Sequence, residues 1–415
     1  MSSILTNNSA MVALQTLKGI NSGLEKTQSM ISTGKEVGSA KDNAAVWAIS
    51  KVMEADVTGF KAISDSLALG ESTVALARDA SETVTDLLKD IKEKIVGSQE
   101  ENVDRAKIQT DIEFLTDQIE SVVGAAQFNG LNLLSNKSNT EGSGTVNVLS
   151  SLDRSSNGDV TSASIGVSKQ DLGIEAHTLG GTAVGAADDL VAVSAASIAA
   201  ATSQTVTFTA GGAVAGASYQ VSLTGAADHD LGTTQIDFEY VARDGDSELD
   251  VSEKIFNDMS AYISARELTG VSVARDATTG AITVTNNDTD AADTIALARA
   301  ETLDGTAGGG LNDLSELDVT TDVGAAEAMA KIEHLIQNSI DSAAAFGSSQ
   351  NRIEIQSNFV GKLMDSMESG IGSLVDADME ETSARLQALQ VQQQLGIQAL
   401  SIANQQPQSI LSLFR

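Results

Sequence analysis

The sequence predicts a mainly α-helical protein: a long antiparallel helical rod or coiled coil formed by both chain ends, with a central α+β insertion. Three observations predict this fold class. Apolar residues recur at alternating four- and three-residue intervals near both termini, as in helices that pack along one face. The centre of the chain loses this spacing and is rich in Ser, Thr, Gly, Ala and Asp. Aromatic residues make up only 3% of the chain and Pro occurs once, which suits closely packed helices better than a large globular core.

The first predicted helix lies near the N-terminus and ends at about Ile31. We call its periodic positions the N-terminal seam: Ala10, Leu14, Leu17, Asn21, Leu24, Gln28 and Ile31. Residues 32–42 contain two Gly and several small polar residues, so they predict a linker. Asp42 or Asn43 then provides an N-cap for the next helix.

The second predicted helix keeps the four-three spacing from about residue 43 to Gly97. At about 1.5 Å per residue it forms a rod of roughly 75–80 Å. Gly97 and Ser98 end it, and a third helix with apolar positions from Ile108 to Ala126 follows after a short connection. Short connections join antiparallel neighbours, so these two helices predict a hairpin.

The central segment begins after a turn at Asn129-Gly130. Alternating patterns predict strands at residues 205–209, 219–223, 236–241, 271–274 and 282–285, and an amphipathic helix at 251–268. Residues 138–320 hold 27 acidic and 7 basic side chains, which is −20 of the total net charge of −32. We therefore expect a strongly acidic α+β insertion.

Helical spacing returns near Val323 and continues to Leu374, with a predicted interruption at Phe346-Gly347-Ser348-Ser349. The last helix follows. We call its periodic positions the C-terminal seam: Val375, Met379, Thr382, Leu386, Leu389, Gln393, Gly396, Leu400, Ala403, Pro407, Ile410 and Phe414. Leu395 and Ile402 widen this stripe beyond what one partner helix covers. The two seams predict a helix pair that other copies of the chain complete, the alternative being a self-contained coiled coil.

Composition narrows the function classes. A net charge of −32 argues against partners that carry phosphates, both nucleic acids and anionic membrane surfaces. The absence of Cys excludes disulfides, thiol catalysis and thiolate metal sites. No apolar run approaches the roughly 20 residues that span a bilayer. The N-terminal residues lack the pattern of a cleaved secretory signal, so an exported chain would need another route.

No motif predicts a catalytic, cofactor or metal site. The three histidines, His177, His229 and His334, have no partner at metal or triad spacing. The segments 228–230 and 244–250 are acidic, but they lack the full spacing of a calcium loop and predict solvated loops. Residues 308–310 are three consecutive Gly, which predict a flexible linker and not a phosphate loop.

Several separated segments resemble bacterial flagellin, and together they cover about half of the chain. They are Ser3 to Leu14, Ile31 to Lys35, Gln127 to Gly130 and Ser401 to Leu413, in the order and at the distances from each end that the family shows. The resemblance implies a structural, non-enzymatic subunit of the bacterial flagellar filament, which serves swimming motility. It implies secretion through the flagellar type III apparatus and an extracellular location in the filament.

The resemblance also implies a division of the chain and a set of partners. Residues 1–42 and 375–415 would form the inner tube, 43–137 and 323–374 the rod, and 138–322 the exposed variable surface. The partners would be further copies of the chain, an export chaperone, the filament cap protein and the hook–filament junction proteins. The expected polymerisation residues are Leu14, Leu17, Leu24, Ile31, Leu386, Leu389, Leu400, Ile410 and Phe414.

One segment departs from the family pattern in an informative way. Flagellins that activate the innate flagellin receptor of animals resemble residues 88–98, but they carry Arg at the position of Asp90 and Leu at that of Lys94. With Lys89 and Glu93, these residues define a region similar to the receptor-binding segment, which predicts weak recognition and an alphaproteobacterial-like flagellin. A secreted coiled-coil adhesin or another type III secretion component is the alternative function, and an enzyme is a distant third.

Overall fold

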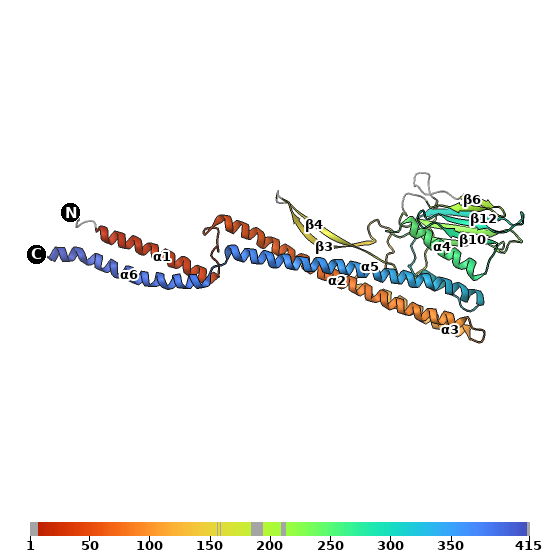
Figure 1. Cartoon of the computed structure of the whole chain (residues 1–415), viewed down its shortest axis with the longest axis horizontal. Helices are drawn as coiled ribbons and strands as arrows, with labels where there is room; N and C mark the ends of the chain where they lie inside the picture. The colour runs from red at the N-terminus through yellow and green to blue at the C-terminus, as the bar shows by residue number, and fades with distance from the viewer. Residues whose placement is uncertain (1–6, 156, 158, 184–193, 209–212, 413–415) are drawn as a thin grey trace. The chain divides into compact units, whose positions relative to one another are not determined.

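The computed structural model describes residues 7–155, 157, 159–183, 194–208 and 213–412. Its contacts group into two compact units, which we describe separately. The smaller unit comprises Met1–Ser64 and Asn358–Arg415, and the larger comprises Asp65–Ser357. Figure 1 shows the helices and strands of both. The prediction of a mainly helical chain with a central α+β insertion is confirmed.

The smaller unit pairs the two terminal helices, α1 (Asn8–Thr33) and α6 (Met379–Ser412) (Figure 1). Asn7 caps α1 by accepting a hydrogen bond from the amide of Ala10 at 3.0 Å. Gly34 ends the helix at φ 70°, a left-handed conformation that favours Gly. The sequence thus fixes both ends of α1 by local capping.

A short backbone joint links the connections next to these helices. Lys35 and Asp376 form an antiparallel bridge, and the amide of Glu36 donates to the carbonyl of Val375 at 2.7 Å. The amide of Ala377 returns a bond to Gly34 at 3.0 Å. The predicted linker before the second helix is confirmed, and α2 (Ala44–Ser98) begins after Asn43, whose side chain accepts from Val46 at 3.3 Å.

Three helices form the rod of the larger unit: the later part of α2, α3 (Arg105–Ala125) and the earlier part of α5 (Asp322–Val375). As predicted, α2 ends at Ser98 and α3 returns beside it, with Lys94 and Asp111 forming an ion pair at 3.1 Å. The fully buried apolar side chains of this rod lie on one face of each helix: Leu67, Val84, Leu88, Ile91, Ile95, Ile112, Ile119, Ile332, Phe346 and Ile353.

The predicted interruption of the last rod helix is wrong, because α5 is continuous from Asp322 to Val375. Phe346 has no exposed surface and acts as a core residue. Nothing lies within 4 Å of the Cβ position of Gly347. The small residues at 347–349 therefore lie on a loosely packed side of the helix. The burial of Phe346 stabilises the helix here and outweighs the low helix propensity of Gly and Ser.

A β-hairpin that the sequence did not predict packs on α2. It consists of β3 (Thr145–Arg154) and β4 (Val160–Ser168), after a small ribbon of β1 (Gln127–Phe128) and β2 (Leu131–Asn132). A Cβ at Gly70 would lie 2.6 Å from a methyl group of Val148, so only Gly lets β3 approach α2 this closely.

The insertion domain contains two antiparallel sheets and one helix. One sheet contains β5 (Thr182–Ala183), β6 (Ser194–Ile198), β8 (Ser218–Gly225), β9 (Ile236–Val241) and β12 (Ile295–Leu303). The other contains β7 (Ser203–Val206), β10 (Val271–Arg275) and β11 (Ile282–Asn286). The helix α4 (Glu248–Ala265) contacts both sheets through β9 and β10.

The five predicted central strands correspond to β7, β8, β9, β10 and β11, while β6 and β12 were not predicted. Thr209, the predicted end of the first strand, lies outside the described residues. A 3₁₀ helix, η1 (Asn312–Glu316), leads back to α5. In the described part of the chain no helix is long and apolar enough to cross a membrane.

Candidate assembly site

The contact face of α6 coincides with the C-terminal seam from Thr382 to Ala403, whereas Met379, the first seam residue of this helix, is 44% exposed. Thr382, Leu386, Leu389, Gln393, Gly396, Leu400 and Ala403 are buried or half-buried, and the residues between them are exposed. The side chains of Ile410 and Phe414 lie outside the description. One helix face therefore meets α1, as the four-three spacing predicts.

The contact face of α1 is shifted from the N-terminal seam at two positions. Leu17, Leu24 and Ile31 are half-buried, but Leu14 is 45% exposed. Within α1, reduced exposure is found at Ala10, Ala13, Leu17, Ile20, Asn21, Gly23, Leu24, Thr27, Met30 and Ile31. Ala13 and Thr27 thus replace Leu14 and Gln28, because small side chains let the two helices lie closer together.

Glycine residues in both helices explain this close approach. A Cβ at Gly396 would lie 3.1 Å from a methyl group of Leu17, and one at Gly23 would lie 3.6 Å from Leu389. The side-chain Nε2 of Gln393 donates to the side-chain Oδ1 of Asn21 at 2.8 Å. Polar seam residues therefore pair across the contact and fix the register of the two helices.

A second apolar stripe on α6 has no cover within the described residues. Val391 is 56% exposed, Leu395 58% and Ile402 69%. Their spacing of four and seven residues places them along one side of the helix. On α1, Met11 and Val12 are 60% and 64% exposed. Apolar surface repeated along both helices is typical of a site for protein association.

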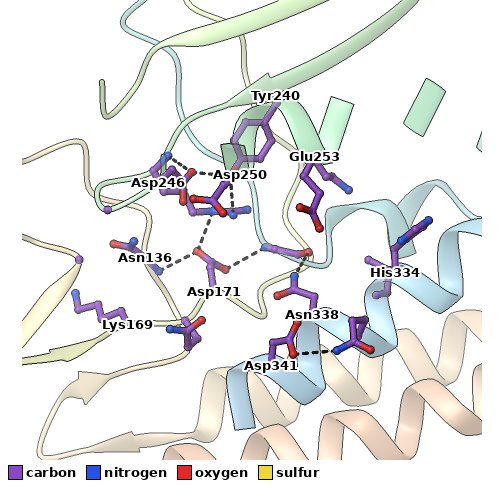
Figure 2. A pocket seen from close by; sticks show the side chains of 18 of the residues that line it. Asn136, Lys169, Asp171, Tyr240, Asp246, Asp250, Glu253, His334, Asn338 and Asp341 are labelled. Carbon is purple, nitrogen blue, oxygen red and sulfur yellow. Dashed lines mark hydrogen bonds and ion pairs between the residues drawn. The ribbon is translucent and has the colours of Figure 1, made fainter. Parts of the chain in front are cut away.

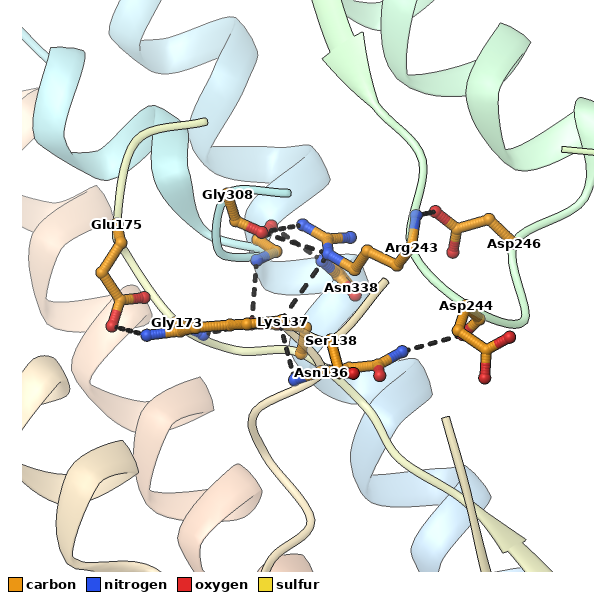
Figure 3. Close-up of polar contacts among 12 residues, drawn as sticks. Asn136, Lys137, Ser138, Gly173, Glu175, Arg243, Asp244, Asp246, Gly308 and Asn338 are labelled. Atoms are coloured by element: carbon orange, nitrogen blue, oxygen red, sulfur yellow. Dashed lines mark hydrogen bonds and ion pairs between the residues drawn. The ribbon is translucent and has the colours of Figure 1, made fainter. Parts of the chain in front are cut away.

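The larger unit contains a polar cavity of about 530 Å³ between the insertion domain and α5 (Figure 2). Arg243 donates to the carbonyl of Gly308 at 2.8 Å and its Nε lies 3.7 Å from the carboxylate of Asp171. Asp171 also accepts from the amides of Asn136 and Gly173, each at 2.9 Å. These bonds tie together segments that leave and re-enter the rod; Figure 2 labels Asp171, and Figure 3 shows Arg243 beside Gly308.

The prediction of a flexible linker at residues 308–310 is wrong. All three Gly are buried, and the amide of Gly309 donates to the carbonyl of Glu175 at 2.8 Å. A Cβ on Gly309 would lie 2.0 Å from the backbone of Gly173. Glycine is thus required where two backbone segments cross in contact.

The acidic and histidine-containing segments make internal contacts. Asp230 accepts from the amides of Thr269 and Gly270 at 2.7 Å, and Asp246 accepts from the hydroxyl of Tyr240 at 2.6 Å. His229 is buried and accepts from the amide of Leu231 at 3.0 Å. Among the described residues no group of three or more His, Asp or Glu side chains has the geometry to hold a metal ion.

Comparison with known proteins identifies the family of this chain. Residues 4–139 match the bacterial flagellin N-terminal helical region, and residues 329–414 match the bacterial flagellin C-terminal helical region. Flagellin A of Rhizobium meliloti is 40% identical over 422 residues, with all of both chains covered. The chain belongs to the bacterial flagellin family.

A second relative from the same species agrees with that assignment. Flagellin B of Rhizobium meliloti is 37% identical, again with 100% of each chain covered. The solved structure of flagellar hook associated protein-3 from Legionella pneumophila matches 78% of this chain and 98% of its own, with a TM-score of 0.37 and 9% identity. This flagellin is a structural subunit of the extracellular flagellar filament and not an enzyme. The family assignment therefore favours the filament subunit over the alternative of a secreted coiled-coil adhesin or another type III secretion component.

Residues 88–98, for which the sequence predicts a receptor-like segment, lie on α2. Lys89, Asp90 and Glu93 are exposed, and Lys89 pairs with Asp86 at 3.0 Å. Lys94 is half-exposed and is held by its ion pair to Asp111 on α3. The four residues therefore present a polar, charged surface.

Proposed function

We propose that the terminal helices of this flagellin form the inner layer of the filament and that their exposed apolar stripes are covered by neighbouring subunits. The observation that carries this proposal is the exposure of Val391, Leu395 and Ile402 on a helix whose other face already contacts α1. Each such side chain contributes about 1.5–3 kcal/mol when it is fully buried. Three of them on every subunit make a favourable term of several kcal/mol for association.

The predicted polymerisation residues then have two roles. Leu17, Leu24, Leu386, Leu389 and Leu400 shape the contact between α1 and α6, with Ile31 at its end. Leu14 faces outward at 45% exposure and belongs to the surface that a neighbour covers. We assign Ile410 and Phe414 to the same surface from the heptad spacing of the sequence.

The remaining layers follow the division expected from the sequence. Residues 43–137 and 323–374 form the rod layer, residues 138–322 form the outer surface, and residues 1–42 and 375–415 form the inner tube. Secretion through the type III apparatus, and binding to an export chaperone, the cap protein and the hook–filament junction proteins, belong to the same proposal. Membership of the flagellin family supports it.

A seeded polymerisation experiment tests the exposed stripe. Purified Leu395→Asp/Ile402→Asp chain is mixed with filament fragments and pelleted, with Gln387→Glu/Gln394→Glu on exposed polar positions of the same helix as the matched control of equal charge. We expect the stripe variant to stay in the supernatant and the control to pellet as the unmodified chain does. Normal pelleting of the stripe variant would show that neighbours cover a different surface.

We also propose weak activation of the innate flagellin receptor, since Asp90 reverses the charge of the Arg that responsive flagellins carry and Lys94 replaces their apolar Leu. Receptor-expressing reporter cells are treated with purified monomer and with the Asp90→Arg/Lys94→Leu variant. The variant is expected to activate at lower concentration than the unmodified chain. Strong activation by the unmodified chain would contradict the proposal.

A further inference from the structure

The insertion domain meets the rod through a cluster of four ionisable side chains beside the polar cavity. Lys254 and Asp258 lie on α4, Asp313 lies on η1, and Lys331 lies on α5. Their side chains are between 8% and 22% exposed. Figure 2 shows the cavity, with residues of α4 and α5 on opposite sides. The cluster therefore lies at a junction of elements and not on the free surface.

The ion pairs of this cluster are unequal. The ammonium group of Lys254 donates a hydrogen bond to Asp313, whereas it lies 3.7 Å from the carboxylate of Asp258, beyond hydrogen-bonding distance. Lys331 lies 3.4 Å from Glu327 and 3.8 Å from Glu316. Lys254 and Lys331 thus contact carboxylates other than that of Asp258. Asp258 therefore shares the positive charge of these two lysines with neighbouring acidic residues.

The surroundings of Asp258 and Asp313 shift the pKa values of these two carboxyl groups in opposite directions. Burial raises the pKa of Asp258 to about 7, helped by the negative charges of Asp313 and Glu316, while Lys254 and Lys331 act against this rise. Burial also acts to raise the pKa of Asp313, but the positive charges of Lys254 and Lys331 outweigh it and lower that pKa. Asp313 therefore stays ionised, and Asp258 changes charge near neutral pH.

We propose that this cluster is a proton-dependent latch that holds the insertion domain on the rod, closed most tightly when Asp258 is protonated. In the closed state Asp258 is 17% exposed between α4, η1 and α5. When the domain lifts from α5, the carboxyl group returns to water, where its ionised form is stable. Ionisation in the closed state costs desolvation, so the proton favours closure.

The direction of the pH effect follows from linkage. The pKa of Asp258 is raised in the closed state, so that state binds the proton more tightly than the open one. Stability of the closed state is therefore greatest at low pH and decreases as pH rises from about 4 to about 7. With one proton and a midpoint near 7, opening becomes about 30-fold more frequent between pH 5.5 and 8.5.

Other charged groups at this interface have roles distinct from that of Asp258. Arg243 keeps its charge, with burial opposing and Tyr240 and Asp171 raising its pKa, so its bond to Gly308 does not change in this range. Burial also raises the pKa of Asp246, but that carboxylate bonds to Tyr240 and Arg243 inside the insertion domain. His334 faces the cavity from an exposed position on α5.

Distance measurements between two spin labels test the latch in the full chain. Because the sequence has no Cys, Ala277→Cys on the insertion domain and Ala344→Cys on α5 allow specific labelling at exposed positions. Pulsed electron paramagnetic resonance measures the distance between the two labels at pH 5.5, 7.0 and 8.5. We expect one narrow distance distribution at low pH and an additional population at longer distance that grows as pH rises. A distance distribution that does not change with pH would overturn the proposal.

Two variants identify the group that titrates. Asp258→Asn mimics the protonated side chain and is expected to keep the narrow distance at every pH. Asp341→Asn is the control, because Asp341 lines the same cavity but is exposed and bonded to Gln337 on its own helix; it is expected to keep the pH response. If the response persists in Asp258→Asn, or disappears in Asp341→Asn alone, Asp258 is not the latch.

A direct titration of the Asp258 carboxyl group by nuclear magnetic resonance tests the proposal without any variant. Carboxyl carbon resonances of the unmodified chain, labelled at Asp, are followed from pH 4 to 9. One resonance assigned to Asp258 is expected to titrate near pH 7. A midpoint at the ordinary value for Asp would refute the latch even if Asp258→Asn did not fold.

Discussion

The terminal helix pair and the insertion domain differ in how many of their own side chains they bury. In α1, 26 residues long, Thr27 is the one described residue that is buried, and it is polar. In α4, 18 residues long, six residues are buried, among them Val251, Ile255 and Met259. A helix with so little burial gains too little from its single partner to be stable alone. The comparison indicates that the terminal pair needs further subunits, whereas the insertion domain completes its own core.

Aromatic residues show the same contrast. The rings of Phe208 and Tyr219 meet edge to face with centroids 5.9 Å apart, and those of Phe238 and Tyr262 do the same at 5.9 Å. The guanidinium of Arg266 lies 3.6 Å from the ring centre of Tyr262. These anchors give the insertion domain a specific core, while described side chains of α1 and α6 are aliphatic or polar.

Charges on the contact face of α6 are expected to have the largest effect. Leu389→Asp/Leu400→Asp places two carboxylates against α1, where Leu389 packs on Gly23, so the pair separates and polymerisation is abolished. Seeded pelleting measures assembly, and circular dichroism measures helix content. The insertion domain should keep its near-ultraviolet spectrum, since none of its core residues changes. Loss of that spectrum as well would break the distinction between the two regions.

A smaller effect is expected where the β-hairpin packs on α2. Gly70→Ala places a methyl group against Val148 and is expected to cost about 1–3 kcal/mol, because the hairpin must shift away from the helix. Hydrogen exchange of residues 145–168 should become faster, with assembly retained. The matched control is Gly124→Ala on α3, where nothing lies within 4 Å of the added carbon. Equal protection of the hairpin in both variants would contradict the packing argument.

Sequence patterns predicted the helices well because each helix uses one repeated face. The C-terminal seam matched the contact face of α6 from Thr382 to Ala403 but not at the exposed Met379, and the N-terminal seam failed at Leu14 and Gln28. At Leu14 the spacing fits Ala13 equally well, and in the structure Ala13 is half-buried while Leu14 is 45% exposed. Periodicity gives the direction of a face to within one residue, and packing selects the residue.

The strands and the polar interface were harder to predict. The hairpin strands β3 and β4 are rich in Ser and Thr, and β12 contains Ala, Arg and Glu, so their apolar alternation is weak. The network of Asp171, Arg243 and Gly308 joins segments far apart in the sequence. No local pattern marks such residues, because each has a role only after the insertion returns to the rod.

The smallest expected effect concerns the start of α4, where local and tertiary contributions can be separated. Ser247 and Asp250 form a capping box, with the Ser247 hydroxyl bonded to the Asp250 carboxylate at 2.7 Å. Ser247→Ala removes one acceptor and is expected to lower the free energy of unfolding of the insertion domain by about 0.5–2 kcal/mol. Urea denaturation followed by tyrosine fluorescence measures this, with Ser264→Ala at the other end of the helix as the control. Because α4 buries six residues, the helix should persist without its cap, unlike an α1 that has lost Asn7. If Ser247→Ala unfolded the whole domain, capping and not the core would hold α4, and the insertion domain would be as dependent on local bonds as the terminal helices.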